Sequence, residues 1–165
     1  MTSATSTLGE LALTIRNGIF ARRPNDDSLG SPILRISSVR DGRVNLDDRR
    51  FVEGLDSDVI ERFRIQPRDL LITRYNGSRS LVGISGIVPE HDGNVVHPDK
   101  LIRVTLDTSR VDPRFINYQL QAPQCRAHLE PRIRTTAGQS GIAGADVRSI
   151  PVVVPPLDDQ RRIVD

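Results

Sequence analysis

The chain has 165 residues, which is enough for one domain with a hydrophobic core and too few for two of ordinary size. The formal net charge is only +2, which excludes the strongly basic proteins that coat nucleic acid without selectivity. Cys125 is the single cysteine, so an intramolecular disulfide and a cysteine-rich zinc site are excluded. No apolar run in the sequence is long enough to cross a membrane. We therefore expect one domain in a reducing cytoplasm.

Arginine dominates the basic side chains, because Lys100 is the one lysine among 23 basic residues. A guanidinium group is a planar fork that pairs bidentately with guanine or phosphate, which a lysine ammonium cannot do. Codon usage in a GC-rich genome would produce the same bias. The arginine content is consistent with base reading and does not establish it.

The N-terminal segment predicts a lead-in followed by a helix. Residues 1–7 lack the charged start and apolar run of a secretory signal, and we predict that they are disordered. Thr7 and Glu10 have the spacing of a capping box, which predicts a first helix that ends near Gly18. After a loop, residues 33–36 predict a compact strand.

The next segment alternates turns with short elements. Asp41 and Gly42 predict a turn. Asp58 is positioned to cap a short helix that ends near residue 64. Pro67 followed by Arg68 predicts a type I turn that needs no positive φ and leads into an apolar strand.

Residues 65–88 predict a strand–loop–strand unit in which Asn76 and Gly77 take positive φ and reverse the chain. A further strand is predicted for residues 101–106. Asp112 before Pro113 then has the pattern of a helix cap with proline at the first helical position. We expect Pro123 to break or kink that helix and a further turn to follow it.

The C-terminal segment is the most informative. A polar, glycine-rich run at residues 135–142 precedes a short buried strand at 151–154, which is bounded by prolines. Pro155 and Pro156 exclude a helix before Leu157, and two aspartates then supply the negative charge that a first helical turn favours. A helix is therefore predicted from Leu157. An ordinary surface helix and a docking helix both remain open.

This order of features resembles the end of a target recognition domain in the specificity subunit of type I restriction-modification systems. The resemblance extends upstream to the strand and glycine turn at residues 35–42, and to a turn in which Arg68 replaces the family's glycine. Asp159 likewise replaces the usual glutamate before Gln160. The resemblance covers roughly residues 8–165.

The fold that this resemblance implies is α/β (α+β), with a single mixed sheet and flanking helices. The domain would occupy residues 8–156, and residues 157–165 would begin a coiled-coil-type connecting helix. Partner docking is expected on that helix, at Leu157, Gln160, Ile163 and Val164.

The resemblance also implies a function in phage defence: sequence-specific binding to one half of a bipartite site in double-stranded DNA. The chain itself would be non-catalytic and bind no cofactor. A modification (methyltransferase) subunit using S-adenosylmethionine, and a restriction subunit using ATP and Mg, would be its partners. A single recognition domain implies a fragment, which we favour, or a half-length subunit that pairs with a second copy or a second recognition domain.

Two polar loops are the candidate DNA contacts, because rigid frameworks usually present binding residues on loops. Their guanidinium, amide, hydroxyl and aromatic groups suit base edges and phosphates. The first loop contributes Arg74, Tyr75, Asn76, Ser78 and Arg79, and the second contributes Arg132, Arg134, Thr135, Thr136, Gln139 and Ser140. Arg22 and Arg23 are a third candidate, for phosphate. A solvated hairpin tip and a solvated arginine pair are the alternatives.

Enzymatic functions lack their required residues. His91, His97 and His128 do not have metal-ligand spacing, so no metal site is predicted. The Gly-Lys-Ser/Thr of a phosphate-binding loop and an Asn-Pro-Pro-Tyr-like methyltransferase motif are both absent from the sequence. Two alternatives remain: the recognition domain of a fused DNA methyltransferase or restriction enzyme, and a protein-interaction module without DNA specificity.

Overall fold

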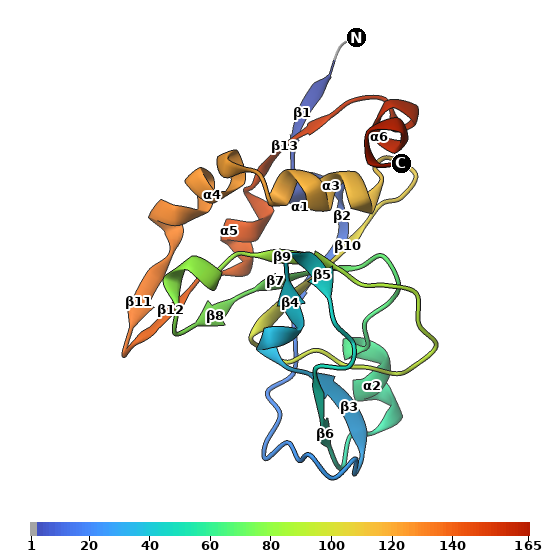
Figure 1. The fold of residues 1–165 in the computed structure, drawn as a ribbon, viewed down its shortest axis with the longest axis vertical. Helices are drawn as coiled ribbons and strands as arrows, with labels where there is room; N and C mark the ends of the chain where they lie inside the picture. Colours follow the sequence, from blue (N-terminus) through green and yellow to red (C-terminus); the bar gives the residue numbers. More distant parts are fainter. Residues whose placement is uncertain (1–2) are drawn as a thin grey trace.

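A six-stranded mixed sheet with the order β2-β10-β7-β9-β5-β4 forms the centre of the computed structural model, which describes residues 3–165 (Figure 1). Only β5 and β9 run parallel; the other neighbours are antiparallel. Its strands are β2 (Ala12–Asn17), β4 (Val39–Arg40), β5 (Gly42–Val44), β7 (Leu70–Thr73), β9 (Ser85–Ile87) and β10 (Leu101–Leu106). The predicted mixed α/β fold is confirmed.

Three smaller sheets surround the central one. They are formed by β1 (Ala4–Thr7) with β13 (Pro151–Val154), by β3 (Ser31–Leu34) with β6 (Arg49–Val52), and by β11 (Arg134–Thr136), β12 (Gln139–Gly141) and β8 (Tyr75–Asn76). The helices are α1 (Leu8–Leu11), α2 (Ser57–Phe63), α3 (Pro113–Leu120), α4 (Pro123–Leu129), α5 (Gly144–Arg148) and α6 (Leu157–Val164), with short 3-10 helices η1 (Ile36–Ser38), η2 (Arg79–Leu81) and η3 (Glu130–Arg132).

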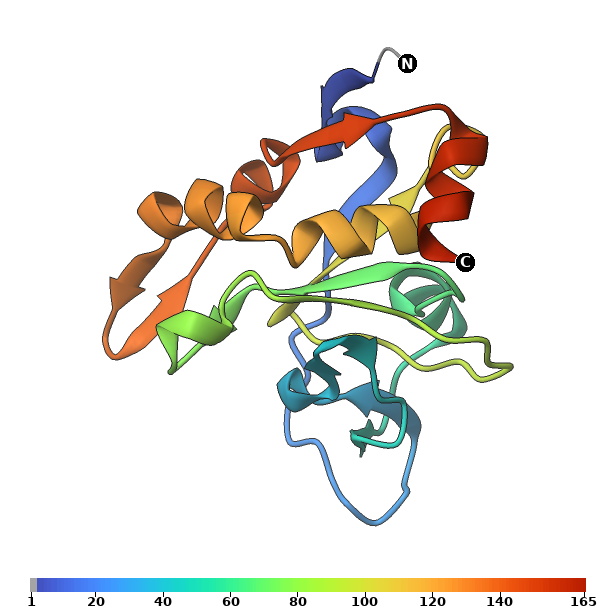
Figure 2. The same ribbon diagram turned by 45° about the horizontal axis from the view of Figure 1, so that its top comes forward.

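The central sheet separates two regions of core. Successive strand residues point to opposite faces, so Leu70 and Ile72 pack under α3, α4 and α5, whereas Leu71 joins a second cluster with Leu34 and Ile65. Figures 1 and 2 show α1, α3, α4, α5 and α6 on one side of the sheet and the β3–β6 pair with α2 on the other. The outer sheet of β8, β11 and β12 projects from the edge of this framework.

The N-terminal predictions need correction. Residues 4–7, predicted to be disordered, form β1 and pair antiparallel with β13; Met1 and Thr2 lie outside the described residues. The capping box is confirmed, because the Glu10 carboxylate accepts the Thr7 N–H at 2.9 Å. The helix, however, ends at Leu11 and not near Gly18. The chain then continues as β2, which pairs antiparallel with β10.

Two turn predictions are wrong in geometry. Arg68 has φ of +71°, and the Asp69 N–H donates to the Gln66 carbonyl, so the turn is type II with arginine at the position that favours glycine. Gly77 does not take positive φ; the chain instead reverses through η2 and Gly83, whose φ is +82°. The predicted Asp41 turn is confirmed between β4 and β5.

The helix starts are predicted better than the turns. Asp56, not Asp58, caps α2, because its side chain accepts the Val59 N–H. Asp112 caps α3 as predicted, and α6 begins at Leu157 as predicted. Pro123 opens a second helix, α4, where the sequence indicated only a break and a further turn.

Candidate nucleic-acid interface

The two loops predicted to contact DNA form one structure. β8 carries the first loop's residues and pairs antiparallel with β12, which places Asn76 opposite Ser140 and Tyr75 opposite Gly141. β11 pairs with the other edge of β12. Residues separated by more than 60 positions in the sequence thus share one three-stranded sheet, which projects from the framework in both ribbon views (Figures 1 and 2).

The second loop is a tight β-hairpin and not an open loop. Thr136 faces Gln139 across a two-residue turn in which Ala137 and Gly138 both have positive φ, at +50° and +77°. This is the pattern of a type I′ turn, whose twist matches that of the flanking strands. The hairpin tip is therefore held in one conformation by its backbone.

Tyr75 is fixed at the base of this sheet. The Arg74 guanidinium carbon lies 4.5 Å from the centroid of the Tyr75 ring, and Arg74 also donates to the Asp99 carbonyl. A Cβ added at Gly141 would lie 2.3 Å from Cδ1 of Tyr75. Gly141 thus allows the Tyr75 ring to pack against β12, where any side chain would collide with it.

Some predicted contact residues are engaged inside the chain. Arg79 forms an ion pair with Glu130 at 2.6 Å and donates to two backbone carbonyls of the segment before β11. Ser140 is only 4% exposed, and its hydroxyl bonds the Thr135 hydroxyl at 2.8 Å. Arg132 donates to the His128 carbonyl. The prediction that Ser140 contacts DNA directly is therefore corrected: its side chain faces inward and joins β11 to β12.

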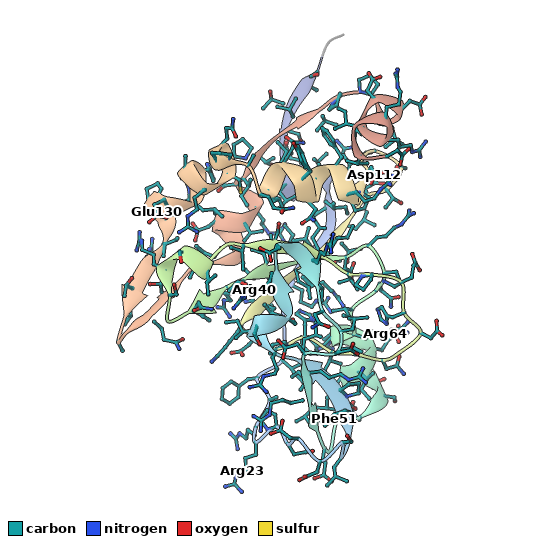
Figure 3. All side chains as sticks on the ribbon, viewed as in Figure 1. Arg23, Arg40, Phe51, Arg64, Asp112 and Glu130 are labelled. Atoms are coloured by element: carbon teal, nitrogen blue, oxygen red, sulfur yellow. The ribbon has the colours of Figure 1, made fainter. Side chains whose placement is uncertain are left out.

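The Arg79–Glu130 pair also connects the first predicted loop to the segment that precedes the β11–β12 hairpin. Glu130 lies at the end of α4, beside the start of the hairpin (Figure 3). It accepts from Arg126 as well as from Arg79, and the hydrogen bond from Arg79 is the main reason that the pKa of the Glu130 carboxyl is lowered. Arg126 in turn donates to the Val82 and Arg79 carbonyls. These contacts fasten η2 to α4.

Other predicted residues of the sheet remain uncommitted. Arg134, Thr136 and Gln139 are exposed, and their side chains make no hydrogen bond or ion pair with any of residues 3–165. Asn76 ends β8, and its side chain accepts the Ser78 N–H at 2.8 Å in the turn that follows. The Ser78 hydroxyl lies 3.0 Å from the Ser80 hydroxyl. The Asn76 amide nitrogen is left for another partner.

A concavity of about 440 Å³ lies where the hairpin meets α5. Its polar lining residues are Arg74, Tyr75, Arg132, Arg134, Thr136, Gln139 and Asp146. The structure thus brings together four of the predicted DNA-contacting residues, namely Arg74, Tyr75, Arg132 and Arg134. Asp146 is a residue that the sequence interpretation missed; its carboxylate accepts the Ala143 N–H and begins α5. The sequence carries no capping-box signature here, because Ala143 at the N-cap has no side-chain acceptor.

Arg22 and Arg23 lie apart from this sheet. They are exposed on the long loop between β2 and β3, at the lower end of the molecule, where Arg23 is labelled in Figure 3. Arg40 on β4 lies between that loop and the projecting sheet in the same view. The structure therefore offers two separate candidate contact regions, and the assignment of both to DNA stays a prediction.

The predicted docking residues on α6 divide into two groups. Ile163 is exposed and Leu157 partly so, which leaves them accessible. Gln160 is fully buried: it accepts the Asp112 N–H and donates to the Pro155 and Arg110 carbonyls. Direct contact by Gln160 is therefore corrected to a role within the domain, where it fixes α6 against α3. Val164 also packs on the core.

Within residues 3–165 there is no cluster of three or more side chains of the metal-ligating types. Over the same residues, each helix is too short or too polar to span a bilayer.

Comparisons with known proteins identify the family. No protein-family model matches the chain. Among curated proteins, the type I restriction enzyme EcoKI specificity subunit of Escherichia coli K12 is 42% identical over 151 residues, or 91% of this chain. This chain belongs to the family of type I restriction enzyme specificity subunits. The StySPI specificity subunit of Salmonella potsdam is 29% identical over 95% of the chain.

This member of the specificity subunit family spans about one third of the length of those relatives, 32% and 34% respectively. Solved structures support the fold. The HsdS subunit from Thermoanaerobacter tengcongensis superimposes with a TM-score of 0.70 over 98% of this chain and 40% of its own, at 18% identity. The type IIG restriction endonuclease BpuSI gives a TM-score of 0.61 over 97% of this chain and 26% of its own, at 11% identity.

Proposed function

We propose that this chain is a target recognition domain that binds double-stranded DNA and reads one half of a bipartite site for a type I restriction-modification system. The observation that carries the proposal is the joining of two distant polar segments into one projecting sheet. That sheet holds arginine, glutamine, asparagine and tyrosine side chains on a backbone fixed by a type I′ turn. The relatives' role as specificity subunits supports it.

The uncommitted side chains fit the chemistry of base edges. Arg134 offers a bidentate fork for guanine, and Gln139 offers an amide that pairs with the N6 and N7 atoms of adenine. Neither side chain must break an internal bond before it binds, because neither has a partner among the described residues. Ordering these two side chains on binding costs conformational entropy, which bidentate hydrogen bonds to the bases offset.

Affinity and selectivity come from different residues in this proposal. Arg22 and Arg23 contact phosphate, which adds affinity that is independent of sequence. The β8–β12–β11 sheet contacts base edges and supplies discrimination. Because phosphate neutralisation releases counterions, binding weakens steeply as the salt concentration rises.

Catalysis belongs to partner subunits. We propose a methyltransferase subunit that uses S-adenosylmethionine, and a restriction subunit that uses ATP and Mg, as the partners of this non-catalytic chain. Docking takes place on the exposed part of α6, at Leu157 and Ile163, since Gln160 already holds that helix against the domain. A second recognition domain or a second copy of the chain reads the other half-site.

A selection experiment tests the proposed function. The chain is mixed with a pool of random duplexes at a low and a moderate salt concentration, and the bound DNA is sequenced. We expect one short motif to be enriched at both concentrations, with less total DNA bound at the higher one. Binding without an enriched motif, or no binding at low salt, would contradict the proposal and favour a protein-interaction module.

A second candidate is the recognition domain of a fused restriction enzyme or methyltransferase. The similarity in fold to a type IIG restriction endonuclease favours this alternative. Both candidates share the DNA-reading sheet and differ in what adjoins it. Sequencing the complete gene distinguishes them, since catalytic motifs in the same open reading frame would support the fused enzyme.

A further inference from the structure

An exposed aromatic side chain on the loop between β2 and β3 is not explained by the fold. Phe20 is 77% exposed, the highest value among the large apolar side chains of the described residues. Single exposed apolar residues are common on protein surfaces and need no explanation by themselves. Phe20 differs because the backbone on both sides of it is held in place.

The residues flanking Phe20 are anchored to the framework. The Ile19 N–H donates to the His97 carbonyl at 3.0 Å, and the Ile19 carbonyl accepts the Asp99 N–H at 2.8 Å. Ile19 and Ala21 both pack against the cluster that contains Ile33, Val52 and Val96. Since residues on either side of Phe20 point inward, the extended backbone directs Phe20 outward.

The rest of the loop is anchored as well. Asn25 exchanges two backbone hydrogen bonds with Phe51, at 2.8 and 2.9 Å, and its side-chain amide donates to the Leu29 carbonyl. A Cβ at Gly18 would lie 2.1 Å from the Pro98 carbonyl oxygen. Only glycine therefore allows the start of the loop to pack this closely against Pro98. Phe20 is therefore presented from a braced segment.

The charges next to Phe20 indicate what it meets. Arg22 and Arg23 follow within three residues and are exposed, and neither forms an ion pair with a residue in the described part of the chain. Asp26, on the same loop, is paired with Arg50 at 3.0 Å. An apolar ring beside two free guanidinium groups complements a polyanion whose interior is apolar, which describes duplex DNA.

We infer that Phe20 is an apolar wedge that inserts at a base step of the bound duplex while Arg22 and Arg23 hold the adjacent phosphates. This inference rests on the proposed function and adds a second contact at a distance from the β8–β12–β11 sheet. In Figures 1 and 2 the loop and the hairpin tip are two protrusions of the molecule with η1 and β4 between them. A duplex that meets both regions passes over the surface between them, and an apolar side chain inserted at a base step unstacks that step and kinks the duplex.

The test uses the duplex enriched by the wild-type chain. Phe20→Ala is expected to lower affinity about tenfold, the scale of one lost aromatic–base contact, without changing the salt dependence, because no charge is removed. It should also reduce the bend measured by energy transfer between dyes on the two duplex ends. Phe20→Leu keeps an apolar wedge and should retain most of the bend.

Tyr118→Ala is the matched control, since Tyr118 is 66% exposed on α3 and lies outside both contact regions. Unchanged affinity and bend in Phe20→Ala, or losses equal to those of Tyr118→Ala, would overturn the inference. Loss of binding to a partner subunit without loss of DNA affinity would also overturn it and assign Phe20 to a protein interface. A different result would contradict the proposed function itself: an Arg134→Ala variant with unchanged DNA affinity and an unchanged enriched motif.

Discussion

The central sheet and the projecting sheet use their polar side chains in opposite ways. At the start of the central strand β7, Asp69 is 2% exposed and accepts hydrogen bonds from the Thr105 hydroxyl and the Gln66 N–H, both at 2.7 Å. In the projecting sheet, Arg134 and Gln139 are exposed and have no partner within residues 3–165. The buried Asp69 carboxylate is thus satisfied inside the chain, whereas Arg134 and Gln139 are left for a ligand.

The same difference appears in how each region is stabilised. Apolar clusters on both faces cover the central sheet. The projecting sheet has a short-range turn, one inward hydroxyl pair between Thr135 and Ser140, and a single anchoring ring, Tyr75. We therefore expect changes in the framework to alter stability, and changes in the projecting sheet to alter binding with little effect on stability.

The largest effect that we predict is the pH dependence of stability due to His97. Its Nδ1 lies 2.8 Å from the Phe63 carbonyl oxygen, and burial lowers the pKa of the ring from 6.5 to about 4. Between those pH values the unfolded chain binds a proton at this residue and the folded chain does not, so stability is lost as the pH falls. The loss should reach about 3 kcal/mol near pH 4.

Urea unfolding at several pH values measures this loss, and His97→Asn is the comparison because it removes the titrating ring. The wild-type chain should lose more stability than the variant between pH 6.5 and 4. NMR titration of the wild-type ring gives an independent reading. A ring that protonates near pH 6.5 in the folded chain would contradict the assignment.

The next effect in size is on Gln160, whose amide makes three hydrogen bonds from a fully buried position. Gln160→Ala should lower the free energy of unfolding by about 2 kcal/mol, because it leaves buried backbone groups unpaired. The neighbouring Arg161→Ala is the control, since Arg161 is exposed and should cost no more than about 0.5 kcal/mol. Equal losses in urea unfolding would mean that α6 is not held by this amide.

In the projecting sheet, Arg134→Ala should weaken specific DNA binding by about tenfold and relax the preference at one base pair, while the unfolding free energy stays unchanged. Fluorescence anisotropy with the enriched duplex measures the affinity. Arg161→Ala again serves as the control, because α6 lies away from the hairpin (Figure 1). If both variants lowered DNA affinity equally, Arg134 would not be a base contact.

The smallest effect is expected for the two exposed arginines of the β2–β3 loop. The double variant of Arg22→Ala and Arg23→Ala should weaken binding similarly for all sequences and lower the slope of log affinity against log salt by about 2. The enriched motif should not change. A changed motif with an unaltered slope would assign these arginines to base contact and not to phosphate.

Local signals in the sequence predicted much of the fold. The Thr7–Glu10 capping box, the Asp112–Pro113 helix start and the proline stop before Leu157 each depend on residues within a few positions of one another. The errors have a different origin. Residues 12–17 were predicted to be helical, but β2 is stabilised by pairing with β10, about 90 positions away.

The candidate site shows the same division. The residue types at the site were chosen from the sequence, but the pairing of Asn76 with Ser140 depends on tertiary structure and has no local signal. For the same reason the sequence did not separate the inward Ser140 from the outward Gln139, although they are adjacent. Alternation along β12 makes that separation once the strand is known. Arg68 illustrates another limit, because its positive φ goes against residue preference and accompanies a hydrogen bond from its N–H to the distant Val88 carbonyl.

A second selection from random duplexes tests the central claim most directly, namely that the projecting sheet reads the DNA sequence. The wild-type chain, a double variant of Arg134→Ala and Gln139→Ala, and the Arg161→Ala control are each selected against the same pool. We predict that wild type and control enrich one motif, and that the double variant binds DNA but loses part of that motif. An identical motif from all three proteins would contradict the account.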